Sequence, residues 1–268
     1  MKKKATIILA SILVVFIVLT VIFEFPCVEN INIPNAGSGC RCMLITDLHS
    51  CYYGKDQKTL TKMVDENSPD LIFLSGDIFD DKLDDDNTKI FLEYIAPRYR
   101  CFYVTGNHEY WSNRVDEMCD YVSSIGITVL RGDCSSIEVG GRTIDICGID
   151  DPTFMSEEEW LAELDSAYGK TSDNSYKILL THRPERVSHY ARYDFDLILS
   201  GHAHAGQFLI PFTGRGTLAP DQGLFPKYVN GLYELDNGSY LIVSRGLARE
   251  STPLPRFFNS PEIITFEI

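Results

Sequence analysis

The chain has 268 residues and a formal charge of −14, with 44% hydrophobic and 23% charged residues. Such a composition is typical of a folded protein and excludes a disordered or collagen-like chain. It also disfavours a nucleic-acid binder that works through a basic patch, because the net negative charge repels polyanions. Apart from an apolar N-terminal segment, about 240 residues remain, enough for one large α/β domain or two small ones.

The N-terminus begins with three lysines at residues 2–4, followed by an uncharged apolar run at residues 5–23. As a helix, this run would reach roughly 28 Å, close to the hydrocarbon thickness of a bilayer. It is longer than the apolar core of a signal peptide, and no small-residue cleavage site follows. We therefore expect a transmembrane signal anchor, with a cleaved secretory signal as the alternative. Residues 1–4 would be a cytoplasmic tail of a single-pass cell-membrane protein, with the rest of the chain extracytoplasmic.

Residues 24–40 contain several Asn, Gly and Pro residues and are expected to form a linker or a lead-in strand. Residues 41–268 are expected to form one domain. The chain has eight cysteines. An even number outside the cytoplasm permits disulfides, but several lie in apolar runs where Cys acts as a small core residue. We expect most to be free buried thiols, and the sequence does not select a pairing.

Short apolar runs in the domain have the continuous hydrophobicity of strands buried on both faces. They cover residues 42–46, 71–75, 101–105, 143–148, 177–181, 197–200 and 240–244. Between them, helices are expected at 57–67, 87–96, 115–125 and 156–167. The last begins with a Ser–Glu capping box. This alternation predicts a layered α/β fold.

Side chains that can bind metal ions follow five of the predicted strands. They are Asp47 and His49, Asp77 and Asp80, Asn107 and His108, His182, and His202 and His204. In open α/β sheets, sites form beyond the carboxyl ends of the strands, so we expect these side chains to converge. Of the six histidines, only His189 lies elsewhere. Mixed imidazole and carboxylate ligands favour Mn, Fe, Zn or Ni over the oxygen-rich sites of Mg²⁺ and Ca²⁺.

The ordered set Asp-x-His, Gly-Asp-x-x-Asp, Gly-Asn-His-Glu, His and Gly-His-x-His runs from Asp47 to His204. It resembles the signature of calcineurin-like binuclear metallophosphoesterases. Segments 205–207, 224–228, 244–247 and 255–258 are similar to the bacterial membrane-anchored branch, so the likeness covers essentially the whole globular part. The resemblance implies a layered β-sandwich flanked by helices. It also implies two divalent transition-metal ions per chain and hydrolysis of a phosphate mono- or diester.

The resemblance also implies a role for each motif residue. One metal would be bound by Asp47, His49 and His204, the second by Asn107, His182 and His202, and Asp77 would bridge them. His108 would face the substrate without binding metal, and Asp80 would orient it. Two cations acidify a bridging water, and the hydroxide attacks phosphorus while His108 assists the leaving oxygen. Asp80 is followed by Asp81-Lys82, whereas Ser/Thr protein phosphatases have Arg-Gly there, which argues against that branch.

The substrate stays open at this point. Residues 208–233 are unusually apolar for a loop near metals. Together with the anchor, this favours a lipid-linked phosphoester, unless these side chains pack as a hairpin over the sheet. Two other functions compete with a membrane-anchored phosphoesterase: a metal-binding module without catalysis, and a secreted nucleotidase or phosphodiesterase. No nucleic-acid partner is expected. The sequence leaves the metal identity and the oligomeric state open.

Several neighbours of the motifs have two interpretations each. Glu109 could support the ligands or lie at a helix start, near the helix dipole. Arg183 and Arg245 could contact phosphate or form salt bridges. The pair Asp150 and Asp151 could lie beside the site or solvate a loop, and the pair Tyr110 and Trp111 could line the cleft or pack in the core.

Overall fold

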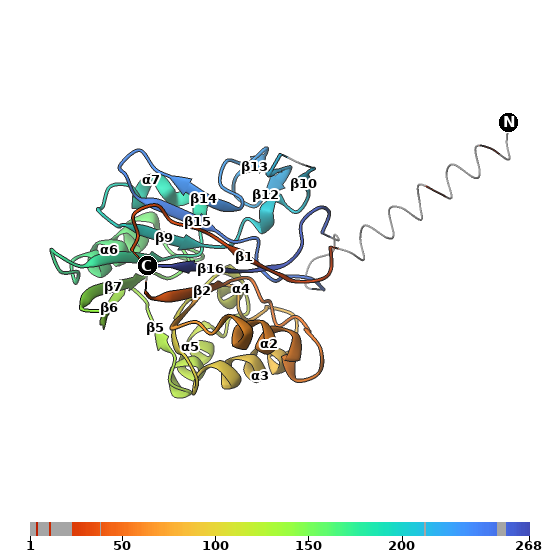
Figure 1. The fold of residues 1–268 in the computed structure, drawn as a ribbon, viewed down its shortest axis with the longest axis horizontal. Helices are drawn as coiled ribbons and strands as arrows, with labels where there is room; N and C mark the ends of the chain where they lie inside the picture. Colours follow the sequence, from red (N-terminus) through yellow and green to blue (C-terminus); the bar gives the residue numbers. More distant parts are fainter. Residues whose placement is uncertain (1–3, 5–10, 12–22, 38, 212, 251–255) are drawn as a thin grey trace.

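The computed structural model describes residues 4, 11, 23–37, 39–211, 213–250 and 256–268. Their architecture rests on two six-stranded sheets (Figure 1). The first has the order β1 (Cys27–Asn30), β16 (Glu262–Glu267), β2 (Arg41–Ile45), β3 (Leu71–Ser75), β4 (Arg100–Val104) and β5 (Thr128–Val129). The second has the order β14 (Gly231–Glu234), β15 (Tyr240–Val243), β9 (Leu197–Ser200), β8 (Tyr176–Leu180), β7 (Arg142–Gly148) and β6 (Asp133–Val139).

The sheets pack face to face around a shared apolar core. Along β2, Cys42 and Leu44 point into this inner core, whereas Met43 and Ile45 point to the outer face, as the two-residue period of a strand requires. Residues of β7, β8 and β9 complete the inner core from the second sheet. Strands β2 to β4 and β7 to β9 are parallel within their sheets, so their carboxyl ends lie at one edge.

Helices cover the outer face of each sheet. Helices α2 (Lys58–Asn67), α3 (Asp86–Ile95) and α5 (Val115–Ser124) pack on the first sheet. Helices α6 (Glu157–Tyr168) and α7 (Val187–Tyr190) pack on the second sheet. Trp160 of α6 is fully buried in this contact. The capping box at the start of α6 is present: Glu159 N donates to Ser156 Oγ at 3.2 Å. The predicted layered α/β fold is therefore confirmed.

The shorter elements lie near the carboxyl ends of the parallel strands. Helix α4 (Asn107–Trp111) follows β4, and the 3-10 turns η1 (Lys55–Gln57), η2 (Pro184–Arg186) and η3 (His204–Gly206) lie in connecting loops. Two small hairpins follow η3. Strand β10 (Leu209–Ile210) pairs with β11 (Arg215–Gly216), and β12 (Leu218–Ala219) pairs with β13 (Gly223–Leu224). Residues 208–233 thus contain hairpins, but the side chains of Leu218, Leu224 and Phe225 are exposed, so the expected packing over the sheet does not extend to them.

All seven predicted strands and all four predicted helices are present, with ends shifted by at most one residue. The sequence analysis did not predict β5, β6, β14 or β16. Within residues 24–40, the segment Cys27–Asn30 forms β1, which pairs with β16 in parallel. A lead-in strand is therefore the better description of this part of the chain.

The predicted transmembrane run at 5–23 falls almost wholly outside the described residues. Among the residues that the structure does describe, no helix combines the length and apolar character needed to cross a bilayer. All eight cysteines are free thiols, most of them buried, as expected. Cys134 and Cys147 face each other across β6 and β7, with their sulfur atoms 3.0 Å apart.

Candidate metal centre and active site

The predicted ligands from the two sheets meet at the carboxyl ends of the strands. They are Asp47 and His49 after β2, Asp77 after β3, Asn107 at the start of α4, His182 after β8, and His202 and His204 after β9. All except His204 are buried. The expected convergence of these side chains is therefore present in the fold. Only His189 among the histidines lies apart, with its ring packed 5.5 Å from that of Trp160.

The backbone at these positions is unusual. Asp47, His49, Asp77, His202 and His204 all have positive φ, between 44° and 65°. Residues with a Cβ rarely adopt this conformation, and such strain clusters at functional sites. Hydrogen bonds between the first two loops hold it in place: Asp47 N donates to Gly76 O at 3.0 Å and His49 N to Asp77 O at 2.9 Å.

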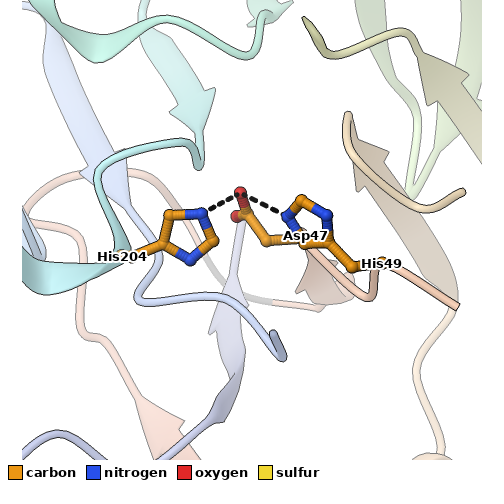
Figure 2. A group of neighbouring side chains, drawn as sticks. All are labelled: Asp47, His49 and His204. Carbon is orange, nitrogen blue, oxygen red and sulfur yellow. Dashed lines mark ion pairs between the residues drawn. The ribbon is translucent and has the colours of Figure 1, made fainter. Parts of the chain in front are cut away.

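A first group of possible ligands consists of Asp47, His49 and His204. Figure 2 shows the Asp47 carboxylate between the two imidazole rings, each with a nitrogen directed at it. Nε2 of His204 lies 3.6 Å from Asp47 Oδ1, and Nε2 of His49 lies 4.0 Å from the same oxygen. The three side chains can therefore share one ion, and they match the ligand set expected for the first metal.

A second group consists of Asp77, His182 and His202. Oδ2 of Asp77 lies 3.1 Å from Nε2 of His182 and 3.5 Å from Nε2 of His49, so it faces both groups. Its other oxygen accepts a hydrogen bond from His108 N at 2.8 Å. Although burial raises the pKa of Asp77, the nearby His182 and His49 hold it well below its usual range. A carboxylate in this position can bridge two ions.

The remote ring nitrogens of three candidate ligands have partners, whereas Nδ1 of His204 is buried and has none among the described residues. His182 Nδ1 donates to Ser75 O at 2.9 Å, and His49 Nδ1 lies 3.1 Å from Asp80 Oδ2. Nε2 of His202 lies 3.0 Å from Asp221 Oδ2 and 2.9 Å from Nη1 of Arg183. Such contacts fix the tautomer and ring orientation of metal-binding histidines, and they leave the second nitrogen for the metal.

Buried atoms without partners test whether metal ions fit this centre. Within the described part of the chain, His49 Nε2, Asp77 Oδ2, Asn107 Oδ1 and His182 Nε2 are buried and have no hydrogen-bond partner. Leaving one such atom unsatisfied costs about 1–3 kcal/mol, so four at one site need an explanation. Metal ions bound by these atoms would satisfy all of them, and the residues present therefore fit a pair of ions.

Glycines bring the backbone close to the ligands. A Cβ at Gly106 would lie 2.3 Å from Asp77 Oδ1, and one at Gly201 would lie 2.4 Å from Asp47 Oδ2. A Cβ at Gly76 would meet His182 Nδ1 at 2.5 Å, and one at Gly246 would meet Asp47 Cβ at 2.5 Å. No side chain fits at these positions, so the glycines fix where the ligands lie.

His108 lies beside the two groups, and two aspartates contact it. Its Nδ1 is 2.6 Å from Asp81 Oδ1 and 3.3 Å from Asp80 Oδ2. Burial lowers the pKa of His108, but the hydrogen bond to Asp80 and the surrounding carboxylates outweigh it and raise the pKa to about 9. Asp80 also contacts His49, so it supports a candidate ligand as well as His108, and Asp81 is the nearer partner of His108.

Glu109 ties the loops of the site together. Its carboxylate accepts hydrogen bonds from Asp77 N at 3.0 Å and Gly106 N at 2.9 Å, and Tyr103 donates to it at 3.0 Å. Both interpretations of Glu109 are therefore correct, because Gly106 is the residue before α4 and Asp77 is a candidate ligand. Full burial, together with the charge of Asp77, raises the pKa of Glu109 to about 7.

A cavity of about 620 Å³ opens over the site. Its wall includes Asp77, Asn107, His108, His202 and His204, and its remaining lining is largely apolar: Trp111, Ala203, Leu218, Ala219 and Pro220. The Trp111 ring lies 4.8 Å from that of His108, and the residue is 47% exposed. Trp111 thus lines the cleft, as one of its two interpretations required.

Arg183 and Arg245, for which phosphate contact and salt bridges were the two interpretations, both form salt bridges. Arg183 is buried and pairs with both oxygens of Asp151, at 2.5 and 3.0 Å, and with Asp221 at 2.5 Å. Arg245 pairs with Glu262, its Nε lying 2.6 Å from Oε2. Asp150 accepts from Thr105, Tyr110 and Arg131, so it supports the loops and is not solvated.

Sequence reasoning missed Asp81 and Asp221 as parts of the site. Asp81 could have been found because it is adjacent to Asp80 and follows the second motif. Asp221 carries no such signal, since it lies in the apolar segment after His204 and reaches His202 only through the tertiary fold. Gly246 was noted only as part of a similar segment, and its contact with Asp47 follows from the fold.

Comparison with known proteins identifies the family of the chain. The family model for calcineurin-like phosphoesterases matches residues 40–206. A Bacillus subtilis protein named uncharacterized metallophosphoesterase YkuE is 29% identical over 248 residues, covering 88% of this chain and 81% of that protein. A Helicobacter pylori metallophosphoesterase is 29% identical over 229 residues, covering 83% of this chain. The chain spans 58% of the length of this relative.

Among solved structures, a dimetal phosphatase from Danio rerio superposes with a TM-score of 0.51 at 11% identity. The superposition covers 79% of this chain and 88% of that one, and at this identity it shows a shared fold. The family is binuclear and metal-dependent, in agreement with the two ligand groups around Asp77. The chain belongs to the calcineurin-like phosphoesterase family.

Proposed function

We propose that the protein hydrolyses a phosphoester with two divalent transition-metal ions at the outer face of the cell membrane. The proposed reaction rests on one observation: Asp77 Oδ2 and three neighbouring ligand atoms are buried and have no hydrogen-bond partner among the described residues. Asp47, His49 and His204 would hold one ion, and Asn107, His182 and His202 the other, with Asp77 between them. Bound there, the ions would neutralise the phosphoryl oxygens and supply hydroxide at neutral pH.

His108 is the proposed general acid. It lines the cavity, and its Nδ1 is engaged by Asp81 and Asp80, which leaves Nε2 to donate a proton to the departing oxygen. Despite burial, the carboxylates around His108 raise its pKa, which favours the protonated imidazole that a general acid needs. The backbone N–H of His108 donates to Asp77, which fixes the ring beside the metal ligands.

The membrane location rests on the sequence of the N-terminal segment. Lysines 2–4 and the apolar run 5–23 have the pattern of a signal anchor with the lysines in the cytoplasm. The catalytic domain would then be extracytoplasmic. An apolar cavity wall beside the metal centre, with Trp111 and Leu218 in it, supports a lipid-linked phosphoester as the substrate.

The experiment uses the full-length chain in detergent, stripped of metal and reloaded with Mn²⁺. Hydrolysis of p-nitrophenyl phosphate and of bis-p-nitrophenyl phosphate is measured for the reloaded protein. The same protein with a chelator is the control. We expect metal-dependent turnover, with a ratio that identifies a monoesterase or a diesterase. The His108→Ala variant should lose about 10²–10⁴ in kcat. His189→Ala is the matched control, because His189 lies away from the site. Absence of turnover with two ions bound would favour a metal-binding module.

A further inference from the structure

An exposed apolar surface lies at the rim of the cavity, on the hairpin β12–β13. Leu218 and Leu224 are directly opposed across the two strands, so their side chains leave the same face of the hairpin. They are 54% and 73% exposed, and Phe225, the next residue, is 72% exposed. Large apolar side chains grouped in this way on a soluble surface mark a site of interaction.

This segment lies close to the point where the N-terminal run joins the domain. The ring of Phe23, the last residue of the run, is 5.0 Å from that of Phe258. Phe257 bridges to Phe208, and its carbonyl accepts from Leu209 N at 3.1 Å. In Figure 1, β10, β12 and β13 lie on the side from which the chain enters β1. A membrane that holds residues 5–22 would therefore lie near the hairpins.

The charge of this segment also suits a lipid surface. Between residues 207 and 230 the basic residues are Arg215 and Lys227 and the acidic residue is Asp221, in a chain whose formal charge is −14. Asp221 is engaged within the fold by the buried Arg183 and by His202. Cations beside exposed Leu and Phe side chains are typical of surfaces that bind anionic lipid.

We propose that hairpin β12–β13 docks on the membrane surface through Leu218, Leu224 and Phe225, and that the cavity thereby opens toward the lipid headgroups. Leu218 belongs to both the exposed pair and the cavity wall, so the docked face and the substrate entrance are continuous. This inference rests on the proposed membrane location. Beyond that location, the proposal specifies that the cavity faces the membrane and that Leu218, Leu224 and Phe225 form the contact surface.

The test places a tryptophan at the proposed contact. Full-length Phe225→Trp protein is reconstituted in phosphatidylglycerol–phosphatidylcholine vesicles, with and without bromine on the acyl chains, and wild-type emission is subtracted. Phe154→Trp is the matched control, because Phe154 is 77% exposed and lies in the loop before α6. We expect a blue shift and bromine quenching at position 225 and neither at 154.

A second pair of variants separates docking from folding and chemistry. Leu224→Asn and Phe225→Asn should slow hydrolysis of a phosphoester lipid in vesicles and leave turnover of p-nitrophenyl phosphate unchanged. Equal quenching at positions 225 and 154, or none at either, would overturn the proposal. A blue shift at 225 without bromine quenching would also overturn it, because protein and not lipid would then cover the hairpin. Quenching needs no turnover, so its outcome is independent of the proposed reaction.

Discussion

Gly246 offers a sharp test of how the fold positions the metal centre. A Cβ at this residue would lie 2.5 Å from Asp47 Cβ and 2.6 Å from Asp47 Oδ2, whereas ordinary contacts begin at 3.4 Å. The neighbouring backbone is held by hydrogen bonds from Glu262 N to Gly246 O and from Leu247 N to Asp47 O, both 3.1 Å. Since the glycine cannot withdraw easily, Gly246→Ala should push Asp47 away by about 1 Å.

Gly238 provides the matched control. Its φ is +87°, against +70° for Gly246, but nothing lies within 4 Å of its Cβ position. Alanine in this conformation costs about 1–2 kcal/mol at either site. Gly246→Ala should add an overpacking cost of about 1–3 kcal/mol. A misplacement of about 1 Å at the reacting centre reduces turnover on the order of 10²-fold, and only Gly246→Ala should show it.

The assay combines urea unfolding with Mn²⁺-dependent hydrolysis of p-nitrophenyl phosphate. Gly246→Ala should lose activity at protein concentrations and temperatures where both variants are folded. Metal bound per chain, measured on the same samples, shows whether the loss comes from weaker binding or from misplaced ligands. Equal activity of the Gly246→Ala and Gly238→Ala variants would refute the reasoning, because the two differ in the contact with Asp47.

Three further predictions concern metal binding and acid stability. Asp221→Asn should weaken Mn²⁺ binding by about 10–100-fold in a competition with a chelator, because Asp221 fixes the remote nitrogen of His202; the exposed Asp236→Asn is the control, and equal affinities would contradict this role. Removing metal should lower the melting temperature, and reloading should restore it, because ions that bind only the folded state stabilise it; an unchanged melting temperature would count against metal at the buried atoms. Asp145 accepts hydrogen bonds from Ser136, Ser172 and Ser175, which hold its pKa below its usual range against the effect of burial. The stability that Asp145 contributes is present above its unfolded pKa and is lost as the pH falls through the folded value. The difference in unfolding free energy between wild type and Asp145→Asn should therefore shrink below pH about 4 in urea titrations, and a constant difference would contradict this.

The strands that carry the ligands could be predicted because each is a short apolar run that ends in polar residues. This pattern depends on burial on both faces, which is a local property of the sequence. The missed strand β16 lies between β1 and β2, and its pairing joins residues more than 200 positions apart. No local feature of Glu262–Glu267 indicates that it completes the first sheet.

The residues of the site also divide into those that the sequence predicts and those that only the fold reveals. Asp47, Asp77 and His202 could be predicted because each lies two residues beyond the end of a strand. Asp221 contacts His202 because the turn between β12 and β13 lies beside η3 in the fold, which a pattern of residues does not encode. Gly246 is required by a steric contact with Asp47, and such contacts appear only when the backbone of both segments is placed.

The central claim is that two metal ions at this centre carry out phosphoester hydrolysis, and a stoichiometric titration tests it most directly. Metal-free full-length protein is titrated with Mn²⁺ while bound metal and p-nitrophenyl phosphate hydrolysis are measured on the same samples. We predict that activity rises with bound metal and reaches its plateau at two ions per chain, and that Asp77→Asn abolishes this dependence. Full activity in the metal-free protein, or a plateau of binding at two ions without hydrolysis of any phosphoester, would contradict the account.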